Sequence, residues 1–230
     1  MRRVLKEHDV RRAEIVAGAW ELFRSRGYDG TTVSAIIDRL GVAKGTFYHY
    51  FDSKEEVLDA VVDRLSLDAH DAVRPVAEAP DLRALDKLNR FMAASRRWRL
   101  ANRALLDSVM RILYRDENII IRHKIQTRNE ARTVPLLARI VREGVEQGVF
   151  HVADPDEAAA AVTAITQLYG TRNTRVLIES PDRRAALAEI RRGIAAAYGA
   201  IERILGAPAG SLEAPDDAVL AGIVNGQSSA

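Results

Sequence analysis

The sequence predicts an all-α protein with a small N-terminal domain of three helices and a larger helical domain after it. Three observations predict this: alanine is abundant, apolar residues recur three or four positions apart, and β-branched residues rarely alternate with polar ones. The 230 residues are 47% hydrophobic and 29% charged, close to the average of globular proteins. The chain is therefore long and apolar enough to bury a core, in one large domain or two smaller ones.

The first two helices are marked by their caps and by their apolar faces. The first spans residues 12–26, and Gly27 suits the left-handed position that ends a helix. Thr31 or Thr32 caps the second helix, and Gly41 ends it. The apolar positions with helical spacing are Ile15, Ala19, Leu22 and Phe23 in the first helix and Val33, Ile36, Ile37 and Leu40 in the second.

Two further helices complete the N-terminal region. The first of them is very short and covers residues 44–51. Ser53 and Glu56 form a capping box for the next helix, because their side chains can accept hydrogen bonds from N–H groups that have no partner within the helix. We expect that helix to end before Pro75, since proline removes a helical hydrogen bond and clashes with the preceding turn.

The C-terminal region begins at residues 75–80, where two prolines mark a boundary. Pro135 is expected to break or kink a long helix or helix pair. Asp154 and Ser180 each precede a proline, as an N-cap precedes the first helical residue. The helices expected here cover residues 82–92, 105–113, 117–148, 155–178 and 181–205. The domains expected are residues 1–72, residues 73–205 and a flexible tail, residues 206–230.

The composition excludes several classes of protein. Cysteine is absent, which excludes disulfide scaffolds, thiolate catalysis and zinc sites with sulfur ligands. The histidines lack the paired spacing of a metal site, and we find neither a nucleophile–base set nor a nucleotide loop, so we expect no metal, no cofactor and no enzyme activity. No run approaches the roughly 18 apolar residues of a membrane span, and the N-terminus lacks a hydrophobic signal core. We therefore expect a cytoplasmic protein without a membrane partner.

The net charge says little about partners until it is counted by segment. The whole chain carries only +2, whereas residues 1–51 hold nine Lys or Arg and six Asp or Glu, a net charge of +3. An anion-binding surface in this region would therefore depend on a few placed groups more than on bulk charge.

Residues 33–51 have the pattern of a helix-turn-helix, in which two short helices are joined by a tight turn. Val42 can fill the space between the helices, and Phe47 and Phe51 can anchor the second helix inward. The side chains that are then turned outward, where a DNA major groove could receive them, are Lys44, Thr46, Tyr48 and His49. Their hydroxyl and ammonium groups suit phosphate oxygens, while a methyl group or an aromatic ring can meet a thymine methyl. Lys54 adds a cation in the first turn of the following helix.

This region resembles the DNA-binding segment of the TetR family of bacterial transcriptional regulators. The family pattern is a threonine-led helix, a Gly-Val-small turn, Gly-x-(aromatic or Leu)-Tyr-x-(His/Tyr)-Phe and then Ser-Lys-Glu-x-Leu. The residues that fit it are Gly45, Phe47, Tyr48, Tyr50, Phe51, Ser53, Lys54, Glu55 and Leu58. The resemblance covers about residues 12–60, and beyond it residues 143–150 are similar to a helix end that is common in the family.

The resemblance implies roles in DNA binding for nine residues. Phosphate contacts are implied for Thr32, Tyr48, Tyr50 and Lys54, and positions facing bases or nearby backbone for Lys44, Gly45, Thr46 and His49. Val33, the ninth, stands where some relatives use a longer polar residue for a base contact, and valine offers no hydrogen-bonding group there. Thr32 could instead serve only as a helix cap, and Tyr50 could simply pack against its neighbours.

The resemblance also implies a homodimer in which the last two helices pair with those of a second copy. The candidate interface residues are Ala161, Ile165, Leu168, Ile190, Ile194, Ala197 and Ile201. The alternative is that these apolar stripes fill only the core of one chain.

An effector pocket is implied in the larger domain. The candidate lining residues are Trp98, Met110, Tyr114, Gln126, Tyr169 and Asn173, although aromatic residues at helical spacing are more often plain core. The arginine-rich run at residues 96–103 is most simply a solvated helix face, with an anionic effector or a second DNA-facing surface as alternatives.

Together these inferences predict a dimeric regulator of transcription that binds double-stranded DNA. Within the family the most common form is a repressor that a small-molecule effector releases from a palindromic operator. The alternatives are an all-helical enzyme, for which no set of catalytic residues is found, and an architectural DNA-binding protein that has no effector.

Overall fold

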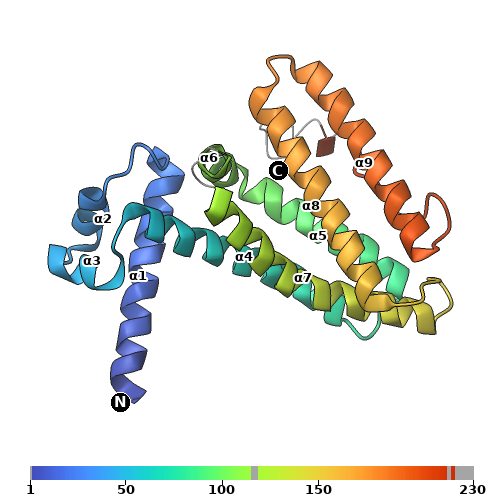
Figure 1. Cartoon of the computed structure of the whole chain (residues 1–230), viewed down its shortest axis with the longest axis horizontal. Coiled ribbons are helices and arrows are strands. Elements are labelled where there is room, and N and C mark those ends of the chain that lie inside the picture. The colour runs from blue at the N-terminus through green and yellow to red at the C-terminus, as the bar shows by residue number, and fades with distance from the viewer. Residues whose placement is uncertain (1, 115–118, 217–218, 221–230) are drawn as a thin grey trace. The chain divides into compact units, whose positions relative to one another are not determined.

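The computed structural model describes residues 2–114, 119–216 and 219–220, and every regular element in these ranges is an α-helix (Figure 1). The helices are α1 (Arg2–Arg26), α2 (Val33–Leu40), α3 (Lys44–Tyr50), α4 (Lys54–Glu78), α5 (Ala84–Ala101), α6 (Arg103–Leu113), α7 (Ile119–Glu146), α8 (Pro155–Glu179) and α9 (Arg183–Leu205). The predicted all-α class is confirmed. The chain packs as two compact units: the N-terminal unit comprises residues 1–68 and 104–125, and the C-terminal unit comprises residues 69–103 and 126–230.

The N-terminal unit has the turns that the sequence predicts. Gly27 and Gly41 adopt left-handed backbone conformations, with φ of +73° and +61°, and end α1 and α2. Thr32 is the N-cap of α2, because its hydroxyl accepts a hydrogen bond of 3.1 Å from the N–H of Ala35. The large apolar side chains buried in α1, α2 and α3 are Ile15, Leu22, Phe23, Ile36 and Phe47.

The start of α4 carries a variant of the predicted capping box. Ser53 Oγ accepts a hydrogen bond of 3.2 Å from the N–H of Glu56, as predicted. The Glu56 carboxylate accepts its bond from the N–H of Asp52, at 2.8 Å, rather than from that of Ser53. The two bonds fix the direction of the chain just after α3.

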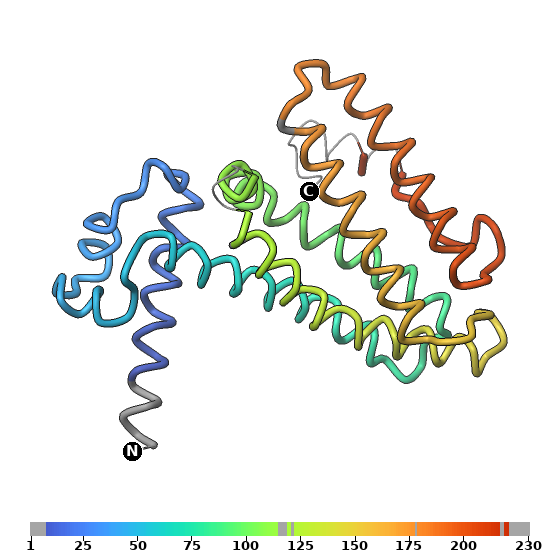
Figure 2. The backbone as a smooth tube through the Cα atoms, in the orientation of Figure 1, coloured from blue at the N-terminus to red at the C-terminus, as the bar shows by residue number. Residues whose placement is uncertain are grey.

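The C-terminal unit buries one large apolar cluster drawn from α4, α5, α7, α8 and α9. Its bulkiest members are Leu88, Phe91, Leu137, Ile140, Val141, Phe150, Val162, Ile201 and Leu205. Lys87, whose side chain is only 2% exposed, pairs with Glu143 and joins α5 to α7. The helices α8 and α9 run side by side and pack on each other (Figure 2).

Two prolines lie inside helices, and the predicted end before Pro75 is wrong. The helix α4 continues to Glu78, and α7 passes through Pro135 as one helix. Pro75 is exposed, so water can reach the carbonyl whose helical hydrogen bond it removes. On the opposite side of α4, Val73 and Ala77 are buried in the apolar cluster. Burial of these neighbours offsets the local cost of the proline.

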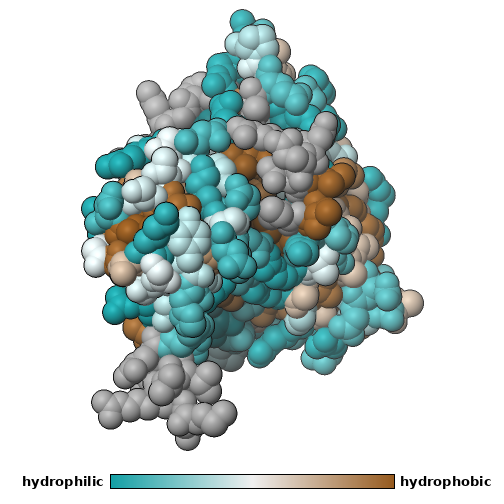
Figure 3. Space-filling model, turned by 60° about the vertical axis from the view of Figure 1, so that its left-hand side comes forward, coloured by the Kyte–Doolittle hydropathy of each residue, from teal (hydrophilic) through white to brown (hydrophobic). Residues whose placement is uncertain are grey.

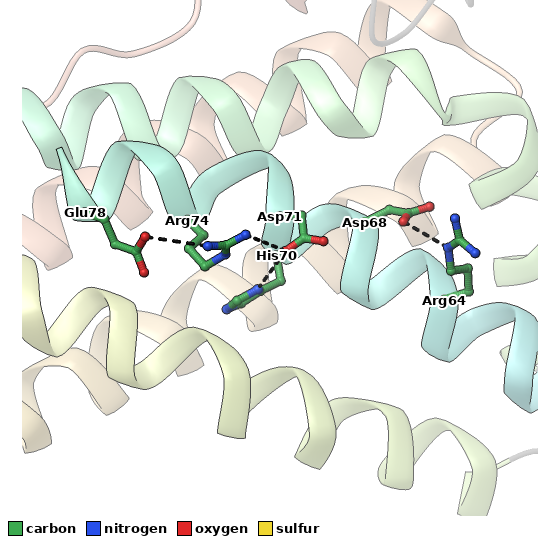
Figure 4. A network of polar contacts seen from close by, with 6 residues as sticks. All are labelled: Arg64, Asp68, His70, Asp71, Arg74 and Glu78. Carbon is green, nitrogen blue, oxygen red and sulfur yellow. Dashed lines mark hydrogen bonds and ion pairs between the residues drawn. The ribbon is translucent and has the colours of Figure 1, made fainter. Parts of the chain in front are cut away.

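The exposed side of α4 carries ion pairs at helical spacing (Figure 4). Arg64 lies 3.1 Å from Asp68, and Arg74 lies 3.4 Å from Asp71 and 3.6 Å from Glu78. Exposed pairs of this kind contribute about 0–1 kcal/mol each, so they support α4 without deciding where it ends.

Two helix boundaries also differ from the prediction. The first helix begins at Arg2 rather than at residue 12. Asp154 caps α8 as predicted, but Ser180 is the C-cap of α8, and Asp182 caps α9. Because the Ser180 N–H still donates to Val176 O at 3.0 Å, the residue is tied to the preceding helix and cannot begin the next one.

The chain after α9 folds back onto the C-terminal unit. Glu202 accepts a hydrogen bond of 2.9 Å from the N–H of the buried Leu212. The Asn89 side chain donates to Ser211 O at 3.0 Å and accepts from the N–H of Glu213 at 2.9 Å. The sequence predicts a flexible tail from residue 206, but residues 211–213 are held by these hydrogen bonds. Residues 217–218 and 221–230 of the predicted tail lie outside the described ranges.

Most of the surface on the face shown in Figure 3 is hydrophilic, and hydrophobic side chains gather there in separate patches. Within the described ranges, no helix combines the length and the apolar character that crossing a bilayer requires.

The packing also assigns α6 to the N-terminal unit, whereas the sequence placed it in the second domain.

Candidate nucleic-acid interface

The short helix α3 has one buried face and one polar, exposed face. Phe47 is 0% exposed within the helix, and Phe51, the residue that follows it, is 1% exposed. The residues exposed on the other face are Lys44, Gly45, Tyr48 and His49, and Thr46 is half-buried. The predicted division between inward aromatic anchors and outward polar groups is therefore present in the structure. The DNA contacts of this face stay a prediction from the sequence.

The start of α2 presents the next predicted contacts. Thr32 is exposed as well as being the N-cap, so its capping role leaves the residue at the surface. Val33 is half-buried and offers no polar group to a base. The phosphate contact proposed for Thr32 would add to its capping role rather than replace it.

Lys54 has a structural role that sequence reasoning missed. Its ammonium group donates to the carbonyl oxygens of Tyr28 and Thr31, each at 3.2 Å, and lies 3.9 Å from the centre of the Tyr28 ring. An ammonium group has three N–H donors, so one is left for a phosphate oxygen. Lys54 thereby ties the connection between α1 and α2 to the start of α4. Its side chain is half-buried.

Glu55 completes this junction from the next position of α4. Its carboxylate accepts a hydrogen bond of 3.2 Å from the Tyr28 hydroxyl. The pKa of Glu55 is lowered, mainly by backbone hydrogen bonding and also by its bonds to Ser53 and Tyr28, against the opposing effect of burial. The carboxylate is therefore held in its charged form beside Lys54.

An aromatic cluster joins α1 to the exposed end of α3. The His8 ring lies 4.6 Å from the Tyr50 ring and 5.7 Å from the His49 ring, and His49 and Tyr50 are 5.1 Å apart. Tyr50 thus packs against its neighbours, which is the alternative left open for it, and it remains half-buried. His8 was not predicted as part of the site, because the predicted first helix began four residues after it.

The six predicted effector-lining residues are all half-buried but are divided between the two units. Met110 and Tyr114 belong to the N-terminal unit, and the other four, Trp98, Gln126, Tyr169 and Asn173, belong to the C-terminal unit. Two of them lie close to Gly193 of α9. A Cβ built on Gly193 would stand 3.4 Å from Cδ1 of the Tyr169 ring and 3.4 Å from Oδ1 of Asn173. The structure therefore brings Tyr169 and Asn173 together where α8 packs on α9.

The seven predicted interface residues differ in how exposed they are. Ile190, Ala197 and Ile201 are at most 5% exposed, so they fill the core of the chain itself, which corrects their assignment to a partner surface. Ala161, Ile165 and Ile194 are half-buried, and Leu168 is 64% exposed. Leu168, on α8, is therefore the most exposed large apolar side chain of these seven residues.

The fold and the site together define a class of protein. An N-terminal helix-turn-helix presents an exposed polar face on its second helix and is followed by a larger, all-helical unit, which is the organisation of a helix-turn-helix regulator. Comparison with known families agrees: residues 15–61 match "Bacterial regulatory proteins, tetR family", and residues 80–191 match "Tetracyclin repressor-like, C-terminal domain". The chain belongs to the TetR family of bacterial transcriptional regulators, which are not enzymes.

Individual relatives support the assignment to different extents. The transcriptional repressor KstR2 of Mycobacterium tuberculosis is 40% identical over 62 residues, which are 27% of this chain and 31% of that protein. A TetR-family regulator from Pectobacterium atrosepticum has the same fold, with a TM-score of 0.66 at 19% identity over 88% of this chain and 98% of that one. A TetR/AcrR-family regulator from Thermobifida fusca has a TM-score of 0.54 at 27% identity over 70% and 84% of the two chains. The chain spans 26% to 38% of the lengths of the curated relatives matched first.

Proposed function

We propose that this protein is a homodimeric transcriptional repressor that acts in the cytoplasm, binds a palindromic DNA operator through α3, and is released by a small-molecule effector. The observation that carries the proposal is the exposed face of α3, with Lys44, Gly45, Tyr48 and His49 outward over a buried Phe47. This is the arrangement in which a recognition helix enters a major groove. Relatives named as transcriptional repressors, KstR2 among them, support repression as the sign of regulation.

A dimer is proposed because one α3 reads only half of a palindromic site. Helix-turn-helix dimers place their two recognition helices about 34–36 Å apart, which corresponds to one turn of DNA. The exposed Leu168 on α8, with the half-buried Ile165 beside it, offers an apolar surface for the second copy. The α8 and α9 helices would then pack with their equivalents in the partner.

Release by an effector would require two conformations with different spacing of the recognition helices. An effector that binds the wide-spaced conformation more tightly shifts the population away from the DNA-bound one, by no more than its difference in affinity for the two. The C-terminal unit is the proposed location of the effector site, because α3 belongs to the N-terminal unit.

The proposal is tested by selecting DNA that the purified full-length chain binds. A randomised duplex library is incubated with the protein, and the bound fraction is sequenced over several rounds. We expect an inverted repeat whose half-sites are one helical turn apart, with stoichiometry of two chains per duplex. Enrichment of a single unrepeated site, or of no sequence at all, would contradict the proposal.

Variants separate base reading from general affinity. Lys44→Ala and Thr46→Ala are expected to change which bases are enriched, because both residues lie on the α3 side that faces DNA in the proposal. Replacing Arg172, an exposed residue of α8 that pairs with Glu189 at 3.3 Å, is the matched control and should leave the enriched sequence unchanged. The sequence then directs a search for bound promoters and for the regulated genes.

A further inference from the structure

Two arginines of α5 and a tyrosine of α9 form a polar cluster of the C-terminal unit, in which Arg96 and Tyr198 are half-buried and Arg99 is exposed. Arg96 donates a hydrogen bond to the Tyr198 hydroxyl, and both Arg96 and Arg99 act electrostatically on that hydroxyl. Arg99 also reaches α8, since its Nη1 lies 3.9 Å from where a Cβ on Gly170 would stand. Three helices, α5, α8 and α9, therefore meet at this cluster.

The two guanidinium groups have no negative partner among the residues that the structure describes. No carboxylate in those ranges lies within 4.0 Å of either group, whereas other cations of the same unit, Lys87, Arg142 and Arg172, each pair with one. Two adjacent positive charges without a counterion repel each other. The arrangement therefore holds positive charge that the described carboxylates do not neutralise.

The surroundings of the cluster strengthen this effect. The Arg99 side chain is accessible to solvent, yet burial by the surrounding protein lowers its pKa, and the charge of Arg96 lowers it further. A charged side chain that is open to solvent and has a perturbed pKa beside a second charge is a candidate for binding a ligand. Burial likewise raises the pKa of Tyr198, so its hydroxyl stays protonated and can donate. Arginine remains charged throughout the physiological range.

We propose that Arg96, Arg99 and Tyr198 bind the anionic group, a carboxylate or a phosphate, of a small and otherwise largely apolar effector. Guanidinium groups present paired N–H donors that match the two oxygens of such a group. Tyr198 packs against the apolar cluster of the C-terminal unit, so apolar side chains of the chain lie next to the polar groups. The role of this ligand as effector rests on the proposed function, whereas its binding to the arginines does not.

The binding test uses the full-length chain without DNA and three probes of equal chain length: octanoate, octyl phosphate and octan-1-ol. Thermal unfolding is followed while each probe is titrated. We expect one or both anions to raise the Tm in a saturable manner and the alcohol to have little effect, and the comparison of the two anions identifies the preferred head group. Equal stabilisation by the alcohol, or no saturable stabilisation by either anion at millimolar concentration, would overturn the proposal.

Variants locate the anion on the chain. Arg96→Gln and Arg99→Gln should each weaken anion binding about tenfold or more, because each removes a charge-assisted hydrogen bond. Arg97→Gln is the matched control, since Arg97 is exposed on the same helix between the two, and it should bind as the wild type does. Should a glutamine variant not fold, Arg99→Lys keeps the charge and should still weaken binding by losing the paired donors. Wild-type affinity in every folded Arg96 and Arg99 variant would overturn the assignment.

A separate measurement distinguishes the site from its regulatory role. Release of the chain from its selected DNA is followed by fluorescence anisotropy as the preferred anion is added. Release by the anion in the wild type and in Arg97→Gln, but not in Arg99→Gln, supports the effector role. Binding through the arginines with no release from DNA would confirm the anion site and contradict its role as effector.

Discussion

Single residues of the N-terminal unit divide into those that hold the structure and those that are presented to solvent. Lys54 belongs to the first group, because its ammonium binds two backbone carbonyls from the connection between α1 and α2. Tyr48 belongs to the second, with 44% of its surface exposed on α3. The sequence places both residues in one motif and implies a phosphate contact for both, but their surroundings predict different consequences of substitution.

Lys54→Ala is expected to destabilise the protein as well as weaken DNA binding. The substitution removes two charge-assisted hydrogen bonds and the contact with the Tyr28 ring, and we expect a loss of about 1–3 kcal/mol in the free energy of unfolding. Urea denaturation followed by circular dichroism measures this loss. Lys44→Ala, an exposed control on α3, should unfold as the wild type does. Equal stability of Lys54→Ala and wild type would show that the carbonyl contacts contribute nothing.

Tyr48→Phe is expected to weaken DNA binding without changing stability. The hydroxyl is exposed and would bind a phosphate oxygen, so its loss should cost about 0.5–1.5 kcal/mol, or roughly 2- to 13-fold in affinity, for any DNA sequence. Fluorescence anisotropy over a series of salt concentrations measures the change. Identical binding curves for the two proteins throughout the series would contradict the hydroxyl–phosphate contact.

At the scale of elements, two glycines in helices differ in whether the surrounding side chains leave room for a Cβ atom. A Cβ on Gly144 would stand 1.9 Å from the Phe150 ring, so packing at the end of α7 requires glycine there. A Cβ on Gly45 would meet nothing within 4 Å, so neither packing nor backbone conformation requires glycine in α3. A DNA backbone that approaches α3 closely from outside would leave no room for a side chain at this position.

Gly45→Ala is therefore expected to keep or raise stability while lowering DNA affinity. Alanine in a helix is favoured over glycine by about 0.5–1 kcal/mol, and its methyl group would stand between α3 and the DNA. Thermal unfolding and binding to the selected duplex are measured on the same preparation. Unchanged DNA binding would show that DNA does not approach α3 at this position. Gly144→Ala, in contrast, should destabilise the C-terminal unit because of its overlap with Phe150.

Element boundaries show which local signals are reliable. The cap at Asp154, the cap at Thr31 or Thr32 and the helix ends at Gly27 and Gly41 were predicted correctly, because each depends on a few consecutive residues. The end of α4 at Pro75 was wrong, because the residues that hold the helix together there are Val73 and Ala77, which are buried by other helices. Local signals predict a boundary only where no tertiary contact opposes them.

At the scale of the whole molecule, the proposed dimer depends on what α8 and α9 leave exposed. Their apolar stripes predict a partner surface of seven residues, but three of these residues are buried in the core of the chain itself. The remaining large exposed apolar side chain of the set is Leu168, at 64%. A stripe at helical spacing shows that a face is buried, but it does not show whether the same chain or a second copy buries it.

Leu168→Asp is expected to convert the dimer to a monomer without unfolding it. A carboxylate in an apolar interface would have to be desolvated without a partner, whereas in the monomer it remains in solvent. Analytical ultracentrifugation measures the molar mass, with Ala131→Asp on an exposed position of α7 as the control. A Leu168→Asp variant that still sediments as a dimer would exclude this surface from the interface.

The sequence by itself determined the features that depend on neighbouring residues. Helical periodicity determined the all-α class, and the order of glycine, threonine and aromatic residues determined the helix-turn-helix with Phe47 inward and Tyr48 outward. These features depend on helix geometry and capping within one or two turns, so they can be recognised without knowing what packs against them.

Only the tertiary structure decided how residues far apart in the chain are brought together. Arg96 and Tyr198 are 102 positions apart, and Asn89 and Glu213, which bring the segment after α9 back onto α5, are 124 apart. The same holds over shorter separations for Lys54 and Tyr28. The sequence alone does not show whether an arginine has a carboxylate partner in the folded chain. The helices that pack around the arginine decide this, because they set its electrostatic environment.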